Sequence, residues 1–175
     1  SQEAGLFAAD RLDHSHTWIK PRLERGDVVV SDRNIHSSII YQGVVGELGV
    51  DTVCQVNSAS MIPDLVFWID CDPDRAIERI KHATLRMSSD KQEYFETPEI
   101  QKTIRQGFHD LFTGSIRVDP PFDKCCIVGP ILNEGGLDEL RQKIQSELRS
   151  FFNRRPTPLN VDEDKVDRYL SLIHI

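Results

Sequence analysis

Three short apolar runs along the chain have the length and composition of β-strands. They cover residues 28–30, 65–69 and 125–128. None of the three alternates polar with apolar positions, so we expect each strand to be covered on both faces, as strands are in a parallel sheet.

Apolar residues at helical spacing lie after the second run. One set falls between residues 100 and 111, and a clearer one between residues 137 and 151, after two consecutive glycines. We therefore predict two amphipathic helices in this part of the chain. The positions that define them are Ile100, Ile104, Phe108, Leu111, Leu137, Leu140, Ile144, Leu148 and Phe151.

Two further helices are indicated earlier in the chain. Leu12, Ile19 and Leu23 share one helical face, and we expect the proline between the last two to kink or restart this helix. Another helix contains residues 76–80. It is expected to begin after Asp72, a typical capping residue, with a proline in its first position.

Strand-like and helix-like segments alternate, and this order predicts an α/β domain. Its parallel sheet is covered by helices on both faces, with right-handed crossovers. We place the domain at residues 1–152. Residues 153–160 have the composition of a linker, and residues 161–175 are expected to form a carboxy-terminal helix or tail.

Composition narrows the class of protein further. The 175 residues carry 21 basic and 28 acidic side chains, and the formal net charge of -7 argues against nonspecific nucleic-acid binding. The longest apolar run, residues 65–69, is far shorter than the ~20 residues that a membrane helix needs. The four cysteines form no CxxC pair, and we expect reduced thiols in a cytoplasmic protein.

The strongest chemical signal directly follows the first predicted strand. It is the segment 32–43, Asp-Arg-Asn-Ile-His-Ser-Ser-Ile-Ile-Tyr-Gln-Gly. Ligands of a parallel sheet bind at the carboxyl ends of its strands, where Asp32 and Arg33 are expected. A guanidinium there matches phosphate oxygens, and the carboxylate can orient it, accept from a sugar hydroxyl or hold Mg²⁺ through water. Ser37 and Ser38 fall in the first turn of the next helix, which favours an anion or a polar base edge.

Tyr41 lies one turn further along the same helix face. The structural alternative for the whole segment is an Asp–Arg pair at a strand end, followed by a serine-rich helix start. Residue types alone do not separate the two interpretations.

A second motif, Leu-Phe-Ala-Ala-Asp-Arg, lies earlier in the chain at residues 6–11. Phe7 and Arg11 are four residues apart, so they share one face of a helix. An aromatic ring can stack on a nucleobase, while a guanidinium donates to a base carbonyl or a phosphate. The structural alternative is a core phenylalanine beside a solvated arginine.

Together, the two motifs resemble the thymidylate kinase family. The likeness runs from about Leu6 to Phe152, and it includes Pro63-Asp64-Leu65 before the second strand and Phe95-Glu96 after Arg86. The resemblance implies a P-loop kinase fold and transfer of the ATP γ-phosphoryl group to dTMP, giving dTDP, with Mg²⁺ required.

The resemblance also implies roles for individual residues. Phe7 would stack on thymine, and Arg11 would hydrogen-bond its edge. Arg33 would bind the dTMP phosphate, with Asp32 near the sugar and the reacting phosphates. The remaining substrate-binding positions would be Ser37, Ser38, Tyr41, Gln42 and Phe95.

Two of these positions and a lid cation have more specific implied roles. Ser38 would approach the base, and Tyr41 would pack where a ribose 2′-hydroxyl would sit, which favours deoxyribose. Arg86 and Lys91 lie in the region that matches the family's mobile lid. A cation there would act on the transferred phosphate, and we name Arg86 as the catalytic candidate.

The chain also departs from the family pattern. Phe95 and Asn34 each stand where the family often has tyrosine, so a hydroxyl contact is lost at the first position and only local packing is affected at the second. Nowhere in the chain is there a G-x-x-x-x-G-K-[ST] loop, which cradles nucleotide phosphates. The family carries this loop on a first strand that lies between the strands represented here by residues 28–30 and 65–69.

We therefore expect a fragment with an incomplete sheet and a groove between those two segments. Alone, it is expected to bind ATP weakly and to leave dTMP unphosphorylated. Two other functions stay open, namely another deoxynucleotide kinase and a non-catalytic nucleotide-binding or interaction module of the same fold. By resemblance we expect a homodimer that uses dTMP and ATP. From the net charge and the short apolar runs we expect neither a nucleic-acid partner nor a membrane.

Overall fold

The computed structural model describes residues 2–79 and 97–154. The candidate residues Arg86, Lys91 and Phe95 lie outside these ranges. So do residues 155–175, which include most of the expected linker and the whole of the expected carboxy-terminal helix or tail.

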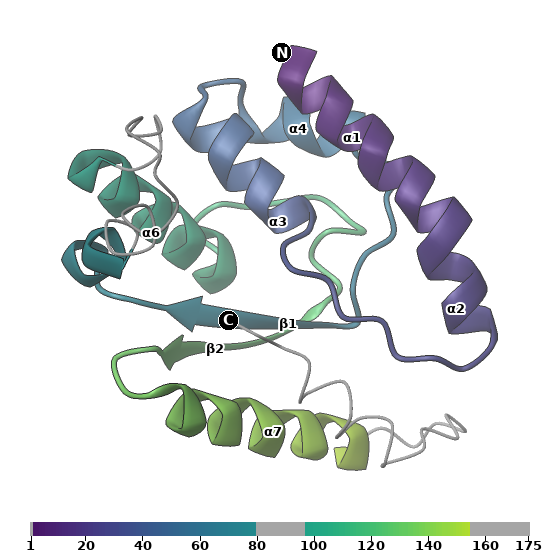
Figure 1. Ribbon diagram of the computed structural model, residues 1–175. Helices are drawn as coiled ribbons and strands as arrows, with labels where there is room; N and C mark the ends of the chain where they lie inside the picture. Colours follow the sequence, from purple (N-terminus) through teal and green to yellow (C-terminus); the bar gives the residue numbers. More distant parts are fainter. Residues whose placement is uncertain (1, 80–96, 155–175) are drawn as a thin grey trace, which may run out of the picture.

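The described chain forms a mixed α/β fold, with α7 on one side of a short sheet and α3, α4 and α6 on the other (Figure 1). Residues 73–79 are also helical. Within the described ranges, none of the helices is long and apolar enough to cross a membrane. In chain order the elements are α1 (Gln2–His14), η1 (Ser15–Ile19), α2 (Lys20–Glu24), α3 (Ile35–Ser38), η2 (Ile39–Val45), α4 (Val50–Val56), β1 (Leu65–Asp70), α6 (Pro98–Thr113), β2 (Cys126–Leu132) and α7 (Leu137–Arg154), where η marks a π-helix.

Strands β1 and β2 pair in parallel and form the sheet of the described residues. The register begins with Leu65 opposite Cys126 and shifts opposite Trp68, where β2 has an extra residue. Gly129 lies at this shift because a Cβ there would be 2.5 Å from the Trp68 carbonyl oxygen. All of β1 is buried or half-buried, as predicted. In the run at residues 125–128, by contrast, Cys126 of β2 is exposed, so the cover predicted for that run is only partial.

The prediction of a strand at residues 28–30 is wrong. This segment is extended but does not join the sheet, and none of the backbone hydrogen bonds among the described residues links it to β1. Val28 packs against the core formed by β2 and α7, whereas Val30 is 56% exposed. Three valines favour extended backbone, but a strand also needs a hydrogen-bonding neighbour, which the tertiary structure decides. A groove between this segment and β1 stays a prediction.

The helices predicted from apolar spacing are confirmed. Helix α6 buries Ile104 and Leu111, and α7 buries Leu140 and Ile144 against β2. The capping prediction is also correct, since the Asp72 carboxylate accepts hydrogen bonds from the first backbone amides of the helix at residues 73–79.

The amino-terminal helix runs through α1, η1 and α2 in succession. Pro21 lies in the first turn of α2, just after the π-helical η1, so the predicted restart is confirmed. Together these elements form the long helix along one side of the molecule (Figure 1). This helix carries the motif at residues 6–11.

The larger hydrophobic core lies where the α3–η2 segment packs against α4 and α6. Ile35, Ile39, Ile40 and Val53 are all 0% exposed, and Ile104 of α6 is 5% exposed. Burying these branched side chains holds α3 and η2 between the other helices. That core therefore sets the position of the Asp-Arg-x-x-x-Ser-Ser motif.

We expect Ile104→Ala to lower the free energy of unfolding by about 2–5 kcal/mol, because it leaves a cavity in this core. Lys102→Ala, at an exposed position of the same helix, is the control and should change it by less than about 0.5 kcal/mol. Urea unfolding measures both. Equal effects of the two variants would mean that α6 does not anchor the core.

Candidate functional site

Arg11 is the centre of a polar cluster that joins three helices. Its Nη2 donates to the Ser38 hydroxyl at 2.7 Å, and its Nη1 donates to Oδ1 of Asn57. Arg11 comes from α1, Ser38 from the end of α3, and Asn57 from the residue that follows α4. Ser38 is 5% exposed and Asn57 is 2% exposed, so the guanidinium is anchored on buried acceptors.

The charge of Arg11 is not cancelled by these two acceptors, because both are neutral. Burial lowers the pKa of the Arg11 guanidinium, and the neighbouring Asp10 carboxylate opposes this effect. An arginine stays protonated in proteins even so. The cluster thus presents a positioned cation with N–H groups beyond the two that these bonds use.

Phe7 precedes Arg11 by one turn of α1, and its side chain is exposed. It is 48% exposed, whereas Arg11 is half-buried. The structural alternative of a core phenylalanine beside a solvated arginine is therefore wrong. An exposed ring next to an anchored guanidinium is an arrangement that can bind a planar ligand.

The turn that carries Arg33 has an unusual backbone conformation. Arg33 has a φ of 65°, in the left-handed region, and the Ser31 hydroxyl donates to its carbonyl oxygen at 2.8 Å. The Asn34 side chain then accepts from the Ile35 amide at 2.7 Å and starts α3. A left-handed residue other than glycine costs about 1–2 kcal/mol, and such strain clusters at functional sites.

The Arg33 guanidinium lies over the ring of Tyr41. Its Cζ is 5.0 Å from the ring centroid, within the range of a cation–π contact. Asp32 and Arg33 are both exposed, and within the described residues no ion pair joins them. The structural alternative, an Asp–Arg pair at a strand end, is therefore not formed.

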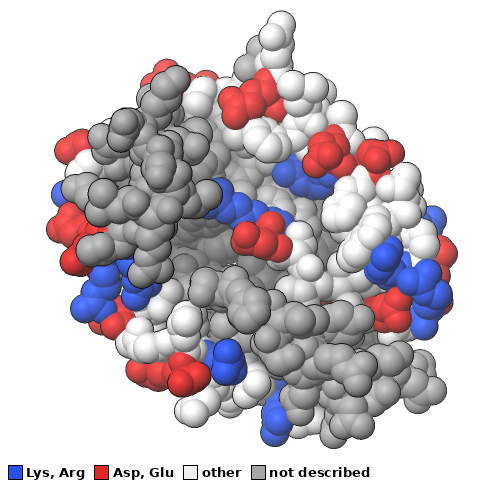
Figure 2. All heavy atoms as spheres, viewed as in Figure 1, with Lys and Arg blue, Asp and Glu red and all other residues white. Residues whose placement is uncertain are grey.

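The structure thus brings several predicted site residues to one helical segment. Arg11 contacts Ser38, and Arg33 contacts Tyr41. Tyr41 follows Ser38 by three residues, so the two contacted side chains lie about one helical turn apart. Figure 2 shows the molecule from the same side as Figure 1, and the surface that faces the viewer is hollowed near its middle. Basic side chains and an acidic one lie at this hollow. Ser37 and Gln42 are half-buried, whereas Arg86 and Phe95 lie outside the described residues.

The comparison with known proteins identifies the family. The sequence model described as "Thymidylate kinase" matches residues 1–118, two thirds of the chain. The chain belongs to the thymidylate kinase family.

Three relatives illustrate the similarity. A probable thymidylate kinase of Thermococcus onnurineus is 37% identical over 109 residues, covering 62% of this chain and 50% of that protein. A thymidylate kinase of Bifidobacterium longum is 38% identical over 112 residues, covering 62% of this chain and 52% of that protein. A thymidylate kinase of Caldicellulosiruptor saccharolyticus is 31% identical over 156 residues, covering 87% of this chain and 69% of that protein. The chain spans about half the length of the first two relatives.

This member of the thymidylate kinase family has two polar contacts that the sequence did not predict. Asn57 has no local signature, since a single asparagine after a helix is common. Asp70, at the carboxyl end of β1, accepts from Arg105 Nε at 2.8 Å and from Nη2 at 2.6 Å. The hydrogen bond to the Asp70 carboxylate is the main reason why the pKa of Arg105 is raised. The strand-end rule that selected Asp32 would have found Asp70 as well.

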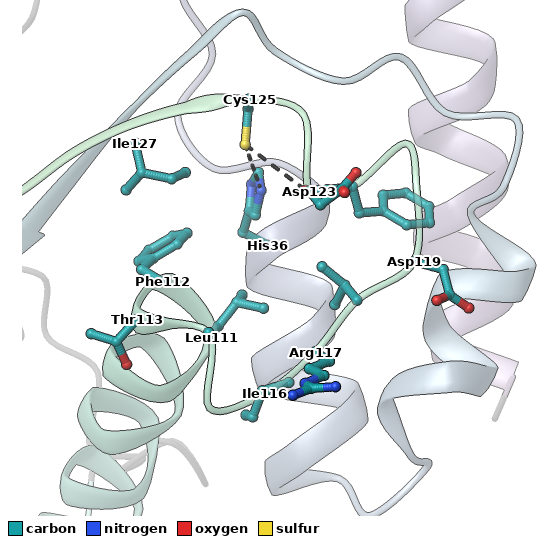
Figure 3. A pocket seen from close by; sticks show the side chains of 13 residues that line it. His36, Leu111, Phe112, Thr113, Ile116, Arg117, Asp119, Asp123, Cys125 and Ile127 are labelled. Atoms are coloured by element: carbon teal, nitrogen blue, oxygen red, sulfur yellow. Dashed lines mark hydrogen bonds between the residues drawn. The ribbon is translucent and has the colours of Figure 1, made fainter.

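The other side of α3 borders a cavity of about 460 Å³ between the end of α6 and the segment that leads to β2. His36, 6% exposed, points toward Cys125 with its Nε2 3.4 Å from the sulfur, and Phe112 lies beside it (Figure 3). Burial lowers the pKa of His36 to about 4 and raises the pKa of the Cys125 thiol. Both groups are therefore neutral at pH 7.

Metal ligation has no candidate in the described ranges. There, no group of three His, Cys, Asp or Glu side chains is placed to hold a metal ion. The four cysteines are free.

Acid should destabilise the fold through His36. Its pKa of about 4 lies below the ordinary 6.5, so between these values the unfolded chain binds more protons and stability rises with pH. This contribution is complete above about pH 6.5 and is lost as the pH falls through about 4. It amounts to about 3 kcal/mol. Urea unfolding at pH 7 and at about pH 4.5 measures it.

His36→Gln should flatten this pH dependence, because the glutamine does not titrate. His16→Gln, which replaces an exposed ring on η1, is the matched control and should keep the parent's dependence. The assignment is wrong if His36→Gln and the parent lose the same stability on acidification.

Proposed function

We propose that the chain supplies the dTMP site of an enzyme that transfers the γ-phosphoryl group of ATP to dTMP, giving dTDP. The observation that carries this proposal is the anchored Arg11 guanidinium, held by Ser38 and Asn57, one turn after the exposed ring of Phe7. These residues lie within the range that matches the thymidylate kinase family. Family membership supplies the reaction class, and the cluster supplies a place for the base.

Recognition of thymine is assigned to Phe7 and Arg11. The exposed ring stacks on the base, and stacking on an aromatic side chain is worth about 1–3 kcal/mol. Arg11 uses two of its five N–H groups in the bonds to Ser38 and Asn57, and others remain to donate to a base carbonyl. Ser38, as an acceptor of Arg11, places that donor near the base edge.

Recognition of the phosphate is assigned to Arg33. An exposed guanidinium binds phosphate oxygens through paired hydrogen bonds. Its contact with Tyr41 limits its rotation before the ligand arrives, so less conformational entropy is lost on binding. Asp32 lies beside it, near the sugar and the reacting phosphates, and Tyr41 fills the space of a ribose 2′-hydroxyl.

Phosphoryl transfer depends mainly on positioning and on neutralising charge. In this proposal Arg33 holds the acceptor phosphate, and Arg86, from outside the described residues, supplies a further cation. Ser37, Gln42 and Phe95 complete the substrate contacts. ATP and Mg²⁺ are required by the proposed reaction, but no phosphate-cradling G-x-x-x-x-G-K-[ST] string occurs among the 175 residues. We assign none of them to either.

We also propose a cytoplasmic homodimer without a nucleic-acid partner. The net charge of -7 and the free cysteines support the compartment and the lack of nucleic acid. Trp18 and Leu23, 41% and 38% exposed along the amino-terminal helix, support a contact between helices of two copies.

Arg33→Ala should weaken dTMP binding by about 10- to 150-fold, since a hydrogen bond to a charged group is worth about 1.5–3 kcal/mol. Thymidine, which lacks the phosphate, should bind the variant and the parent alike. Titration calorimetry with both ligands measures the difference. Arg25→Ala, at an exposed arginine paired with Asp27, is the matched control and should bind dTMP as the parent does. An unchanged ratio of dTMP to thymidine affinity in Arg33→Ala would contradict the assignment.

Phe7→Ala should weaken the binding of dTMP and of thymidine by the same factor, about 5- to 150-fold, because the lost stacking involves only the base. Leu6→Ala removes the neighbouring side chain, 72% exposed, and serves as the control with unchanged affinity. If Phe7→Ala bound dTMP as tightly as the parent does, the proposed stacking of Phe7 on the base would be wrong.

The reaction itself is tested on the protein encoded by the complete reading frame, with ATP, Mg²⁺ and a panel of nucleoside monophosphates. Release of ADP that depends on dTMP supports the proposal. A preference for another monophosphate would indicate a different deoxynucleotide kinase. Binding of dTMP without turnover would indicate a non-catalytic nucleotide-binding module.

A further inference from the structure

We infer that Asn57 is a positioning residue for base selection, fixing the Arg11 guanidinium so that its remaining N–H groups donate to a base carbonyl and find no acceptor in a base amino group. The inference rests on the proposed function and adds to it. It concerns a side chain that reaches the base only through Arg11.

Asn57 is held in one orientation. It is 2% exposed, at the end of α4, and its Nδ2 donates to the Val53 carbonyl at 2.8 Å. Because the amide nitrogen is engaged within its own helix, Oδ1 is the atom that faces Arg11. The Ser60 hydroxyl also lies 3.5 Å from Oδ1. The side chain is therefore a fixed acceptor, built into the packing around α4.

Two acceptors fix the plane of the Arg11 guanidinium. Asn57 accepts from Nη1 and Ser38 from Nη2. Ser38 ends α3, whereas Asn57 directly follows α4. With one acceptor the group could pivot about a single hydrogen bond, but with two its position and plane are both set. The direction of its remaining N–H groups is then fixed as well.

A fixed guanidinium can discriminate between bases. It has donors and no acceptor, so it pairs with a carbonyl oxygen and cannot pair with an amino group. Thymine and uracil carry a carbonyl where cytosine carries an amino group. A guanidinium free to pivot would turn away from the amino group and avoid the mismatch. The selectivity therefore depends on the anchor as well as on the arginine.

The decisive variant is Asn57→Leu, which keeps the number and branching of the side-chain heavy atoms and removes the acceptor. Calorimetry on the full chain measures affinities for dTMP, dUMP and dCMP. The parent should favour dTMP and dUMP over dCMP. In Asn57→Leu the ratio of dTMP to dCMP affinity should fall about tenfold, the value of one hydrogen bond to a charged group. The ratio of dTMP to thymidine affinity should stay unchanged, because Arg33 is untouched.

Rescue and control variants separate positioning from stability. Asn57→Asp keeps an oxygen acceptor and should retain base selectivity. Val53→Ala destabilises the same helix, where Val53 is 0% exposed, and Ser60→Ala removes the other group near Oδ1. Both leave the contacts of Arg11 in place and should keep the parent's selectivity. If Asn57→Leu does not fold, Asn57→Ser takes its place, because its shorter side chain cannot reach Arg11.

The outcomes distinguish this inference from the proposed function. If the parent selects dTMP and the variant without the acceptor selects it equally well, Asn57 has no positioning role and the proposed function stands. An equal loss of selectivity in Val53→Ala would likewise overturn the inference, because the effect would follow stability. A parent that binds no dTMP would overturn the proposed function and this inference with it.

Discussion

The arrangement of the site depends on the burial of one helical segment, α3–η2. Ile35, Ile39 and Ile40 are inaccessible to solvent and pack between the neighbouring helices. Because the apolar positions face the core, the polar positions between them are directed to opposite sides. Ser38 meets Arg11 of α1, and His36 meets the segment that leads to β2. A single buried segment therefore separates two polar environments.

The polar environment on the α1 side is organised around a cation that is costly to bury. Removing a guanidinium from water is unfavourable unless hydrogen bonds replace the lost hydration. Ser38 and Asn57 supply such bonds without neutralising the charge. The Asp70–Arg105 pair is different, since a carboxylate there engages the guanidinium through two bonds. Arg11 is thus suited to bind a ligand, whereas Arg105 ties α6 to the end of β1.

Much of the fold could be predicted because its signals are local. The apolar spacing of α6 and α7 and the Asp72 cap involve residues three or four positions apart, and the structure confirms them. The predicted strand at residues 28–30 failed because a strand depends on a neighbour. Local sequence describes a tendency toward extended backbone, but it cannot supply the second half of a hydrogen-bonded ladder.

The family and most candidate residues follow from the amino-acid sequence alone, since the two motifs at residues 6–11 and 32–43 are contiguous strings of specific side chains. The exposure of Phe7, and the hydrogen bond by which Asn57 anchors Arg11, become visible only once the chain is folded. Arg11 and Asn57 are 46 positions apart, and Asp70 and Arg105 are 35 apart. Contacts over such separations depend on the path of the packed chain, because no local period or spacing records which distant side chains the core brings together.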